Sequence, residues 1–227
     1  MKPSDKIDFQ NVGELTRRLT AQKITPPRFS FEIPERDAAN GIYSAMRAEV
    51  ANRRMTLSFD DATKSHIEQV ARWLIDPHGK PGIMFMGACG NGKTTTMRAL
   101  ARLIEYVTEQ TVGYSKRTVV QIYSAKELAN ECVALQGNPK EFRELVNREM
   151  IGIDDLGEEP KEIIEYGRVH TPIIDLISER YNRQLGMIIT TNLTGEQLAA
   201  KYGPRIYDRF KEALLIVPFQ NESYRKQ

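Results

Sequence analysis

Residues 87–94 constrain the fold more than any other segment of the chain, and they read Gly-Ala-Cys-Gly-Asn-Gly-Lys-Thr. The segment matches the pattern G-x-x-x-x-G-K-[ST], in which glycines let several backbone N–H groups converge on one phosphate. The pattern has this meaning only between a strand and a helix. Here the short apolar run 83–86 precedes it, and apolar residues at helical spacing follow it from residue 93 to about residue 109. We therefore expect a phosphate-binding loop.

The residue types in this loop predict its ligand. The amino end of the following helix adds partial positive charge, and Lys93 is placed to reach the β and γ phosphates of a nucleotide. Thr94 supplies a hydroxyl that suits Mg²⁺. We expect ATP and Mg²⁺ as cofactors. The predicted cofactor-binding residues are Gly87, Ala88, Cys89, Gly90, Asn91, Gly92, Lys93, Thr94 and Thr95.

Strand and helix patterns alternate through the rest of the chain. Strands are expected at 83–86, 118–123, 150–153, 186–191 and 213–217, and helices at 61–75, 93–109, 125–135, 141–149, 171–184 and 195–201. This alternation is typical of a parallel sheet with helices on both faces. A chain of 227 residues, 41% of them hydrophobic, is long enough for one such α/β domain and a short appendage. We predict a P-loop NTPase fold.

Polar side chains follow two of the predicted strands. Asp154 and Asp155 end the apolar run 150–153, where ATPases of this class carry their second motif. We expect Asp154 to hold Mg²⁺ through water and Asp155 to act in catalysis by polarising the attacking water. Asn192 follows the strand 186–191, and we expect it to hold that water.

Two of these assignments leave alternatives. Thr191 is the second choice for the role given to Asn192. Asp155 is one methylene shorter than the Glu found in many such ATPases, so turnover is expected to be slow, or Glu158 or Glu159 contributes. A nucleotide-gated binding module with little hydrolysis is therefore an alternative function. A small-molecule kinase is a weaker rival, because it normally needs a basic lid over the acceptor.

The first 58 residues read as a separate appendage. A short amphipathic helix is expected at 12–19, prolines at 26, 27 and 34 indicate an extended linker, and a second amphipathic helix is expected at 38–54. We predict a helical arm for partner binding at 1–58 and the ATPase core at 59–227. Because the phosphate chemistry lies after Ile83, nucleotide binding is expected not to need the arm.

Six segments together resemble the AAA+ helicase loaders of the DnaC type and the related IstB-like ATP-binding proteins. They are GACGNGKT at 87–94, IGIDDLG at 151–157, the stretch from 166–168 into 173–180, IITTNL at 188–193, GPRIYDRF at 203–210 and ESYR at 222–225. The resemblance covers about residues 42–227. It implies an AAA+ core without a helical C-terminal lid domain.

The resemblance also implies roles and partners. Arg209, in Asp208-Arg209-Phe210, is the counterpart of an arginine finger, which acts on the nucleotide of a neighbouring subunit. Hydrolysis would then depend on assembly into a homo-oligomer. Arg205 and Arg225 are further candidates for interface or nucleotide contacts. The implied partners are single-stranded DNA and a replicative helicase, or a transposase if the chain is a transposition helper.

Composition adds few constraints. The net charge of +2 predicts no global field for nucleic acid, so DNA contacts would need a local patch. Candidates are Arg98, Arg102 and the pair 116–117, although these are equally typical of solvated surfaces, and Arg102 is spaced to pair with Glu105.

No stretch of the sequence is apolar enough for a membrane span or a secretory signal, so we expect a cytoplasmic protein that does not contact membranes. Its two cysteines, Cys89 and Cys132, are expected to be reduced. The three histidines, His66, His78 and His170, have no metal-ligand spacing and are expected at the surface.

Overall fold

A sheet of five parallel strands forms the centre of the molecule. The computed structural model describes residues 11–22, 28–165 and 167–224. The strands are β1 (Gly82–Gly87), β2 (Gln121–Ser124), β3 (Met150–Leu156), β6 (Gly186–Thr191) and β7 (Leu214–Phe219). They lie in the order β2-β3-β6-β1-β7, and every neighbouring pair is parallel. This arrangement confirms the predicted parallel α/β fold.

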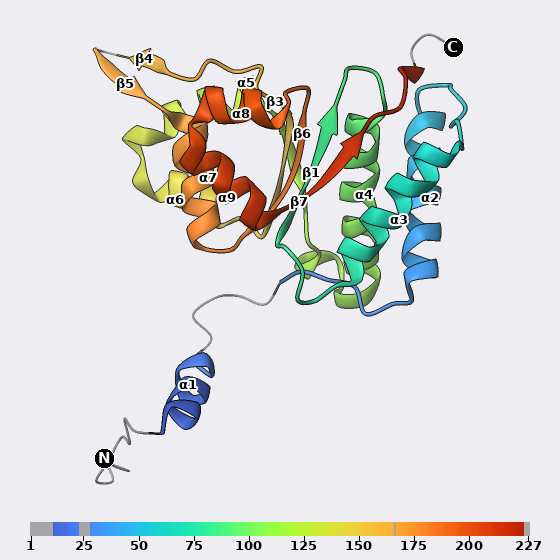
Figure 1. Cartoon of the computed structure of the whole chain (residues 1–227), viewed down its shortest axis with the longest axis horizontal. Coiled ribbons are helices and arrows are strands. Elements are labelled where there is room, and N and C mark those ends of the chain that lie inside the picture. Colours follow the sequence, from blue (N-terminus) through green and yellow to red (C-terminus); the bar gives the residue numbers. More distant parts are fainter. Residues whose placement is uncertain (1–10, 23–27, 166, 225–227) are drawn as a thin grey trace.

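Helices cover both faces of the sheet (Figure 1). One face carries α2 (Glu35–Ala51), α3 (Asp61–Ile75) and α4 (Lys93–Val112). The other carries α5 (Ala125–Ala134), α6 (Pro139–Asn147), α7 (Pro172–Asn182), α8 (Gly195–Tyr202) and α9 (Pro204–Ala213). Single 3-10 turns lie at Tyr114–Lys116 and Leu135–Gly137. Each face has its own apolar core, so the strands are buried on both sides.

Capping side chains fix where several helices begin. The Asp60 side chain accepts a backbone N–H at the start of α3. Ser124 and Glu127 form a reciprocal capping box at α5, and Thr194 and Gln197 form another at α8. Within the described residues, no helix is both long and apolar enough to cross a bilayer.

A two-stranded hairpin follows β3, and the sequence did not predict it. Its strands are β4 (Ile163–Glu165) and β5 (Arg168–His170), which pair antiparallel. Figure 1 shows the hairpin projecting away from the sheet. Ile164 and Val169 face each other across it and are both exposed. Strands of three residues give too short an alternation to detect in a sequence.

The predicted arm divides into two parts with different environments. α1 (Val12–Thr20) has no buried residue. α2 instead packs against α3 and α4 and buries Ile42 and Met46 in the core. Phe31 is also buried, and Arg28 donates to the carbonyl of Lys80 over 2.8 Å. The part of the arm from residue 28 onward therefore belongs structurally to the core.

Candidate active site

A cavity of about 470 Å³ lies where β1, β3 and β6 end. This volume is in the range of small-molecule sites. The cavity brings together all three groups that the sequence singled out, namely the phosphate loop, the two aspartates after the strand 150–153, and Asn192. Its lining residues are Val50, Arg53, Met55, Cys89, Gly90, Asn91, Gly92, Lys93, Thr94, Thr95, Arg98, Asp154, Asp155 and Asn192.

The loop between β1 and α4 has a backbone that only glycines accommodate well. Gly90 and Gly92 have φ values of 87° and 97°, in the left-handed region. A side chain at Gly87 would overlap the carbonyl oxygen of Phe219 on β7. The curl ends at Lys93, the first residue of α4, so the amino end of this helix points at the cavity.

The Lys93 ammonium lies inside this loop. Its Nζ donates to the carbonyls of Gly87 and Ala88 over 2.7 and 2.6 Å and to Asn91 Oδ1 over 3.1 Å. The Lys93 side chain is therefore held by the loop, not by the apolar core. Gly87 and Ala88 take part in the site through these carbonyls, although they do not line the cavity. Cys89 is exposed and Cys132 is buried.

Thr94 and Asp154 form a pair suited to a hard cation. The Thr94 hydroxyl donates to Asp154 Oδ1 over 2.9 Å at the wall of the cavity. A hydroxyl and a carboxylate beside a phosphate loop fit the oxygen ligands that Mg²⁺ prefers, and the remaining positions would be left to water and phosphate. The same Oδ1 accepts a second hydroxyl, that of Thr190, over 2.6 Å.

Thr190 is a site residue that sequence reasoning missed. It is fully buried on β6, yet its hydroxyl donates to Asp154 and accepts the Asp155 N–H over 2.8 Å. The signal that points to it is a polar residue inside an apolar strand whose neighbour ends in carboxylates.

Asp155 adopts a conformation that is uncommon for a residue with a side chain. Its φ is 55°, and the pairing of β3 with β6 shifts register between Ile153 and Leu156. Asn192 Nδ2 donates to Asp155 Oδ1 over 3.4 Å, which places both predicted catalytic groups side by side. Burial raises the pKa of Asp155, and the charge of Asp154 raises it further, against the opposing effect of Lys93.

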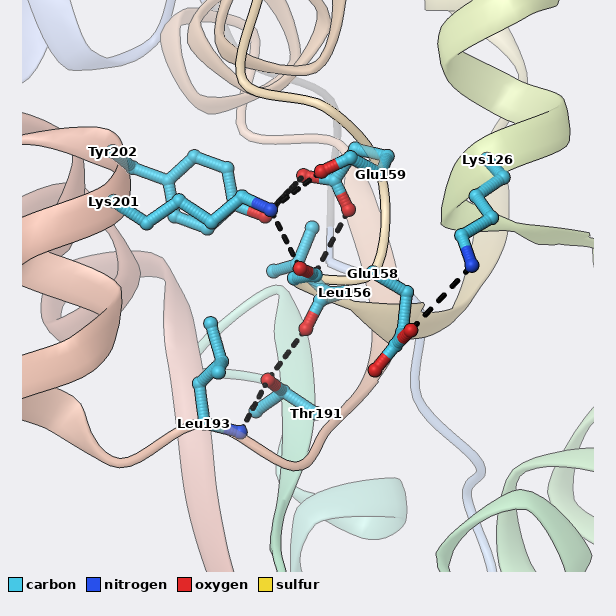
Figure 2. Close-up of polar contacts among 9 residues, drawn as sticks. Lys126, Leu156, Glu158, Glu159, Thr191, Leu193, Lys201 and Tyr202 are labelled. Atoms are coloured by element: carbon cyan, nitrogen blue, oxygen red, sulfur yellow. Dashed lines mark hydrogen bonds and ion pairs between the residues drawn. The ribbon is translucent and has the colours of Figure 1, made fainter.

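Figure 2 shows the alternatives to these residues together with their hydrogen-bond and ion-pair partners. Thr191 is buried and donates its hydroxyl to the Leu156 carbonyl over 2.6 Å, so it holds backbone together. Glu158 forms an ion pair with Lys126 over 3.5 Å. Glu159 is buried and turned toward α8. None of the three lines the cavity, which favours Asn192 and Asp155.

Arginines from two helices also reach the cavity. Arg53, just beyond the end of α2, lines it and donates to Thr95 Oγ1 over 3.3 Å. Arg98 of α4, considered above for DNA, also lines the cavity. Arg102 pairs with Glu49 over 3.4 Å and not with Glu105 as its spacing suggested. Arg53 could not be recognised as a cavity residue from a local sequence pattern, because α2 lies more than thirty residues before the phosphate loop.

Arg209 does not line the cavity of its own chain. It lies on α9, where it donates to Ser178 Oγ over 2.6 Å and stands 5.1 Å from the ring of Tyr181 on α7. Arg205 is exposed near the start of α9. Arg225 lies outside the described residues. In this conformation Arg209 therefore lies outside the cavity of its own chain, and its role stays a prediction.

Residues 219–224, here termed the C-terminal strap, form hydrogen bonds to the backbone of the phosphate loop. The Tyr224 N–H donates to the Gly90 carbonyl over 3.0 Å, and Asn221 Nδ2 donates to the Asn91 carbonyl over 3.2 Å. The Tyr224 hydroxyl donates to the Asp60 carboxylate at the start of α3 over 2.9 Å. The strap therefore ties the loop to α3.

His66 corrects the expectation of three surface histidines. It is buried, stacks on Phe219 with ring centroids 3.7 Å apart, and lies 3.1 Å from the Pro218 carbonyl through Nε2. Because a carbonyl can only accept, Nε2 carries the proton. Burial lowers the pKa of His66, although the Pro218 carbonyl and Asp60 oppose the shift.

The sheet order, with a phosphate loop after β1, carboxylates after β3 and a polar residue after β6, defines the AAA+ type of P-loop fold. Crystal structures of other proteins are similar in fold. The DnaC helicase loader matches with a TM-score of 0.54 and 21% identity over 71% of this chain and 92% of that chain. DnaI matches with a TM-score of 0.53 and 20% identity over 83% of this chain and 95% of that chain.

A DNA replication initiation factor also matches, with a TM-score of 0.50 and 16% identity over 71% of this chain and 47% of that chain. No protein-family model and no curated protein sequence matches. The chain thus shares the fold of the DnaC and DnaI structures, as the resemblance in the sequence led us to expect.

Proposed function

We propose that the chain is an ATP-dependent helicase loader, an AAA+ ATPase that binds ATP and single-stranded DNA and acts on a replicative helicase in the cytoplasm. The observation that carries the ATPase part is the single cavity that gathers Lys93, Thr94, Asp154, Asp155 and Asn192. These residue types match the needs of phosphoryl transfer, which are phosphate binding, cation binding and water positioning.

Each of these residues has a distinct task in the proposed reaction. The loop N–H groups and Lys93 bind the phosphates, so Lys93 exchanges its loop carbonyls for phosphate oxygens. Thr94 and Asp154 would hold Mg²⁺, which would neutralise charge on the phosphates. Asp155 and Asn192 orient the attacking water, and Asp155 accepts its proton.

The arginine finger comes from a second copy of the chain. Arg209 stands outside its own cavity but has only partial burial on α9. An assembled neighbour places Arg209 against the transferring phosphate, where a finger contributes roughly 10³ to 10⁵ in rate. Hydrolysis by the isolated chain is therefore slow, and it rises when copies assemble side by side on single-stranded DNA.

The contact with the helicase is assigned to α1. Its apolar residues Val12 and Leu19 are 70% and 54% exposed, and together with Leu15 they lie at helical spacing on one side. Such a stripe is suited to docking in a groove of another protein. A transposase in place of the helicase, as for the IstB-like helpers, is the alternative partner.

The ATPase proposal is tested by comparing binding with turnover. ATP titration and steady-state phosphate release, each with and without single-stranded DNA, are measured for the intact chain and for Lys93→Ala. We expect Lys93→Ala to lose tight binding while its melting temperature stays unchanged. Tight binding with no turnover in any assembly would favour the nucleotide-gated binding module.

The partner is tested with purified proteins. Gel filtration of the full chain with the replicative helicase of the same cell is compared with that of a chain lacking residues 1–27. Co-elution that needs these residues supports the loader, and co-elution with a transposase alone supports the helper.

A further inference from the structure

Glu159 lies four residues after Asp155, yet it does not line the cavity, and its carboxylate points toward Lys201 and Tyr202 of α8 (Figure 2). Only 2% of the residue is exposed. Its Oε2 accepts the N–H of Gly157 over 2.9 Å, and its Oε1 accepts the hydroxyl of Tyr202 at the end of α8. The carboxylate therefore links the turn after β3 to α8.

Lys201, the residue before Tyr202, binds the same turn. Its Nζ donates to the carbonyls of Gly157 and Glu159, both over 2.5 Å, and lies 3.8 Å from Glu159 Oε1. One ammonium thus holds the turn at two backbone positions. We use the term latch for Glu159, Lys201 and Tyr202 together.

A buried carboxylate is unfavourable unless it is paired and hydrogen-bonded. Here the carboxylate has a backbone donor, a phenol and an ammonium, so its partners come from this chain and no ligand is needed to satisfy it. Burial raises the pKa of Tyr202, and the bond to Glu159 raises it further, so the phenol stays protonated and donates. These contacts indicate that the latch fixes the backbone of the turn after β3.

The backbone segment that the latch fixes begins at Asp155. This residue keeps a φ of 55° only because its surroundings fix it. On the β6 side, Thr190 accepts its N–H and Thr191 donates to the next carbonyl, that of Leu156. On the far side, the Asp155 carbonyl accepts the N–H of Glu158, which lies within the segment that the latch anchors.

We propose that the latch of Glu159, Lys201 and Tyr202 positions Asp155 for catalysis by fixing the turn 155–159 against α8. The three are positioning residues, because none of them lines the nucleotide cavity. The proposal rests on the ATPase function proposed above. It predicts that breaking the latch lowers the rate of the chemical step and leaves nucleotide binding unchanged.

Two variants of the full chain break the latch with little change of shape. Lys201→Met removes the ammonium, and Tyr202→Phe removes the hydroxyl while its ring stays edge-on to Phe210. Lys126→Met is the matched control, because Lys126 forms an exposed ion pair with Glu158 in the same turn. For each variant, kcat at saturating ATP and Mg²⁺, the Kd for ATP and the melting temperature are measured.

We expect both latch variants to lose about tenfold in kcat with Kd for ATP within about twofold of the intact chain. Lys126→Met should match the intact chain. In an Asp155→Asn background the latch variants should have no further effect, because the latch acts through Asp155. An equal loss in both backgrounds, or a Kd that weakens as much as kcat falls, would overturn the proposal.

Hydrogen–deuterium exchange separates this proposal from the ATPase function. We expect amides in 155–159 to exchange faster in Lys201→Met and Tyr202→Phe, with no change in the phosphate loop. Unchanged exchange in this turn would refute the latch whatever the hydrolysis data show. Faster exchange in a chain that hydrolyses no ATP in any assembly would support the latch as a clamp on the turn and refute the ATPase function.

Discussion

Thr190 donates its hydroxyl to Asp154 Oδ1 over 2.6 Å and so joins β6 to β3 beside the phosphate loop. The Thr190 hydroxyl oxygen in turn accepts the Asp155 N–H over 2.8 Å. Thr190→Val keeps the shape but loses both bonds, so the Asp155 N–H loses this acceptor and Asp154 Oδ1 keeps the Thr94 hydroxyl as a donor. We expect the free energy of unfolding to fall by roughly 1–3 kcal/mol. ATP hydrolysis should also need more Mg²⁺, which a titration of the rate with Mg²⁺ measures.

Thr190→Ser is the control for this prediction, because it keeps the hydroxyl. It should retain most of the hydrolysis and most of the stability. If the Ser and Val variants lose activity equally, the packing of the methyl group matters and the hydrogen bonds do not.

The residues of the phosphate loop and its partners could be found in the sequence because their chemistry is local. Lys93 and Thr94 follow their glycines within one motif, and the aspartates end an apolar strand. In a parallel sheet such strand ends meet at one edge of the sheet, which brings Asn192 Nδ2 within 3.4 Å of Asp155 Oδ1. The sheet order is then enough to assemble the site.

Other features depend on contacts between distant segments of the chain, which a local sequence pattern does not indicate. Glu159 is close to Asp155 in sequence, but the turn at Gly157, with a φ of 112°, directs its carboxylate to α8. Arg53 reaches the cavity only because α2 packs on α4. His66 has the sequence surroundings of a surface histidine and becomes buried only when β7 lies beside α3.

The C-terminal strap should influence nucleotide affinity. Tyr224→Phe removes the hydroxyl that bonds Asp60 and Thr63 and leaves the backbone bond to Gly90 in place. The phosphate loop is then held less firmly. We expect the Kd for ATP to rise about threefold to tenfold, which corresponds to the free energy of about one hydrogen bond. Tyr106→Phe, at a site 64% exposed on α4, is the control and should leave the Kd unchanged. An unchanged Kd for Tyr224→Phe would limit the strap to its backbone contact.

His66 makes stability depend on pH. Its pKa is lowered in the folded chain, chiefly by burial, whereas a histidine in an unfolded chain has a pKa of about 6.5. Below that pH the unfolded chain binds the proton more readily than the folded chain, so the free energy of unfolding falls as pH falls. Above it, the contribution is constant.

We therefore expect the melting temperature to fall between pH 7.5 and 5.5, and the fall to be smaller in His66→Gln than in the intact chain. His78→Gln is the matched control, because His78 is exposed. A fall of equal size in His66→Gln would assign the pH dependence to other groups.

Two truncations distinguish the parts of the N-terminal arm. A chain that starts at Arg28 loses α1 but keeps α2, so its melting temperature and its affinity for ATP should match the intact chain. A chain that starts at Phe59 loses α2, whose Ile42 and Met46 are 0% and 5% exposed. Each such side chain contributes roughly 1.5–3 kcal/mol by burial. It also loses Arg53 from the cavity wall, so both stability and affinity should fall. Equal melting of the two chains would show that α2 is dispensable.

Arg209 is expected to act on the nucleotide of a neighbouring subunit, because it stands outside its own cavity while its own phosphate loop is complete. Arg209→Ala should bind ATP normally and hydrolyse it poorly, since a finger contacts charge that develops during transfer and adds little to ground-state binding. Arg143→Ala, at an exposed site on α6, controls for the loss of a surface charge.

A mixture of Arg209→Ala with Lys93→Ala tests whether the arginine acts between subunits. The first variant offers an intact phosphate site, and the second offers the missing arginine, so phosphate release by the mixture should exceed the sum of the two separate rates. Single-stranded DNA is present to favour assembly, and gel filtration confirms that mixed assemblies form. The contacts of Arg209 with Ser178 and Tyr181 are lost in the variant, so its melting temperature is measured in parallel. If mixed assemblies form and the rate never exceeds the sum, Arg209 does not act on a neighbour, and its role is to hold α9 against α7.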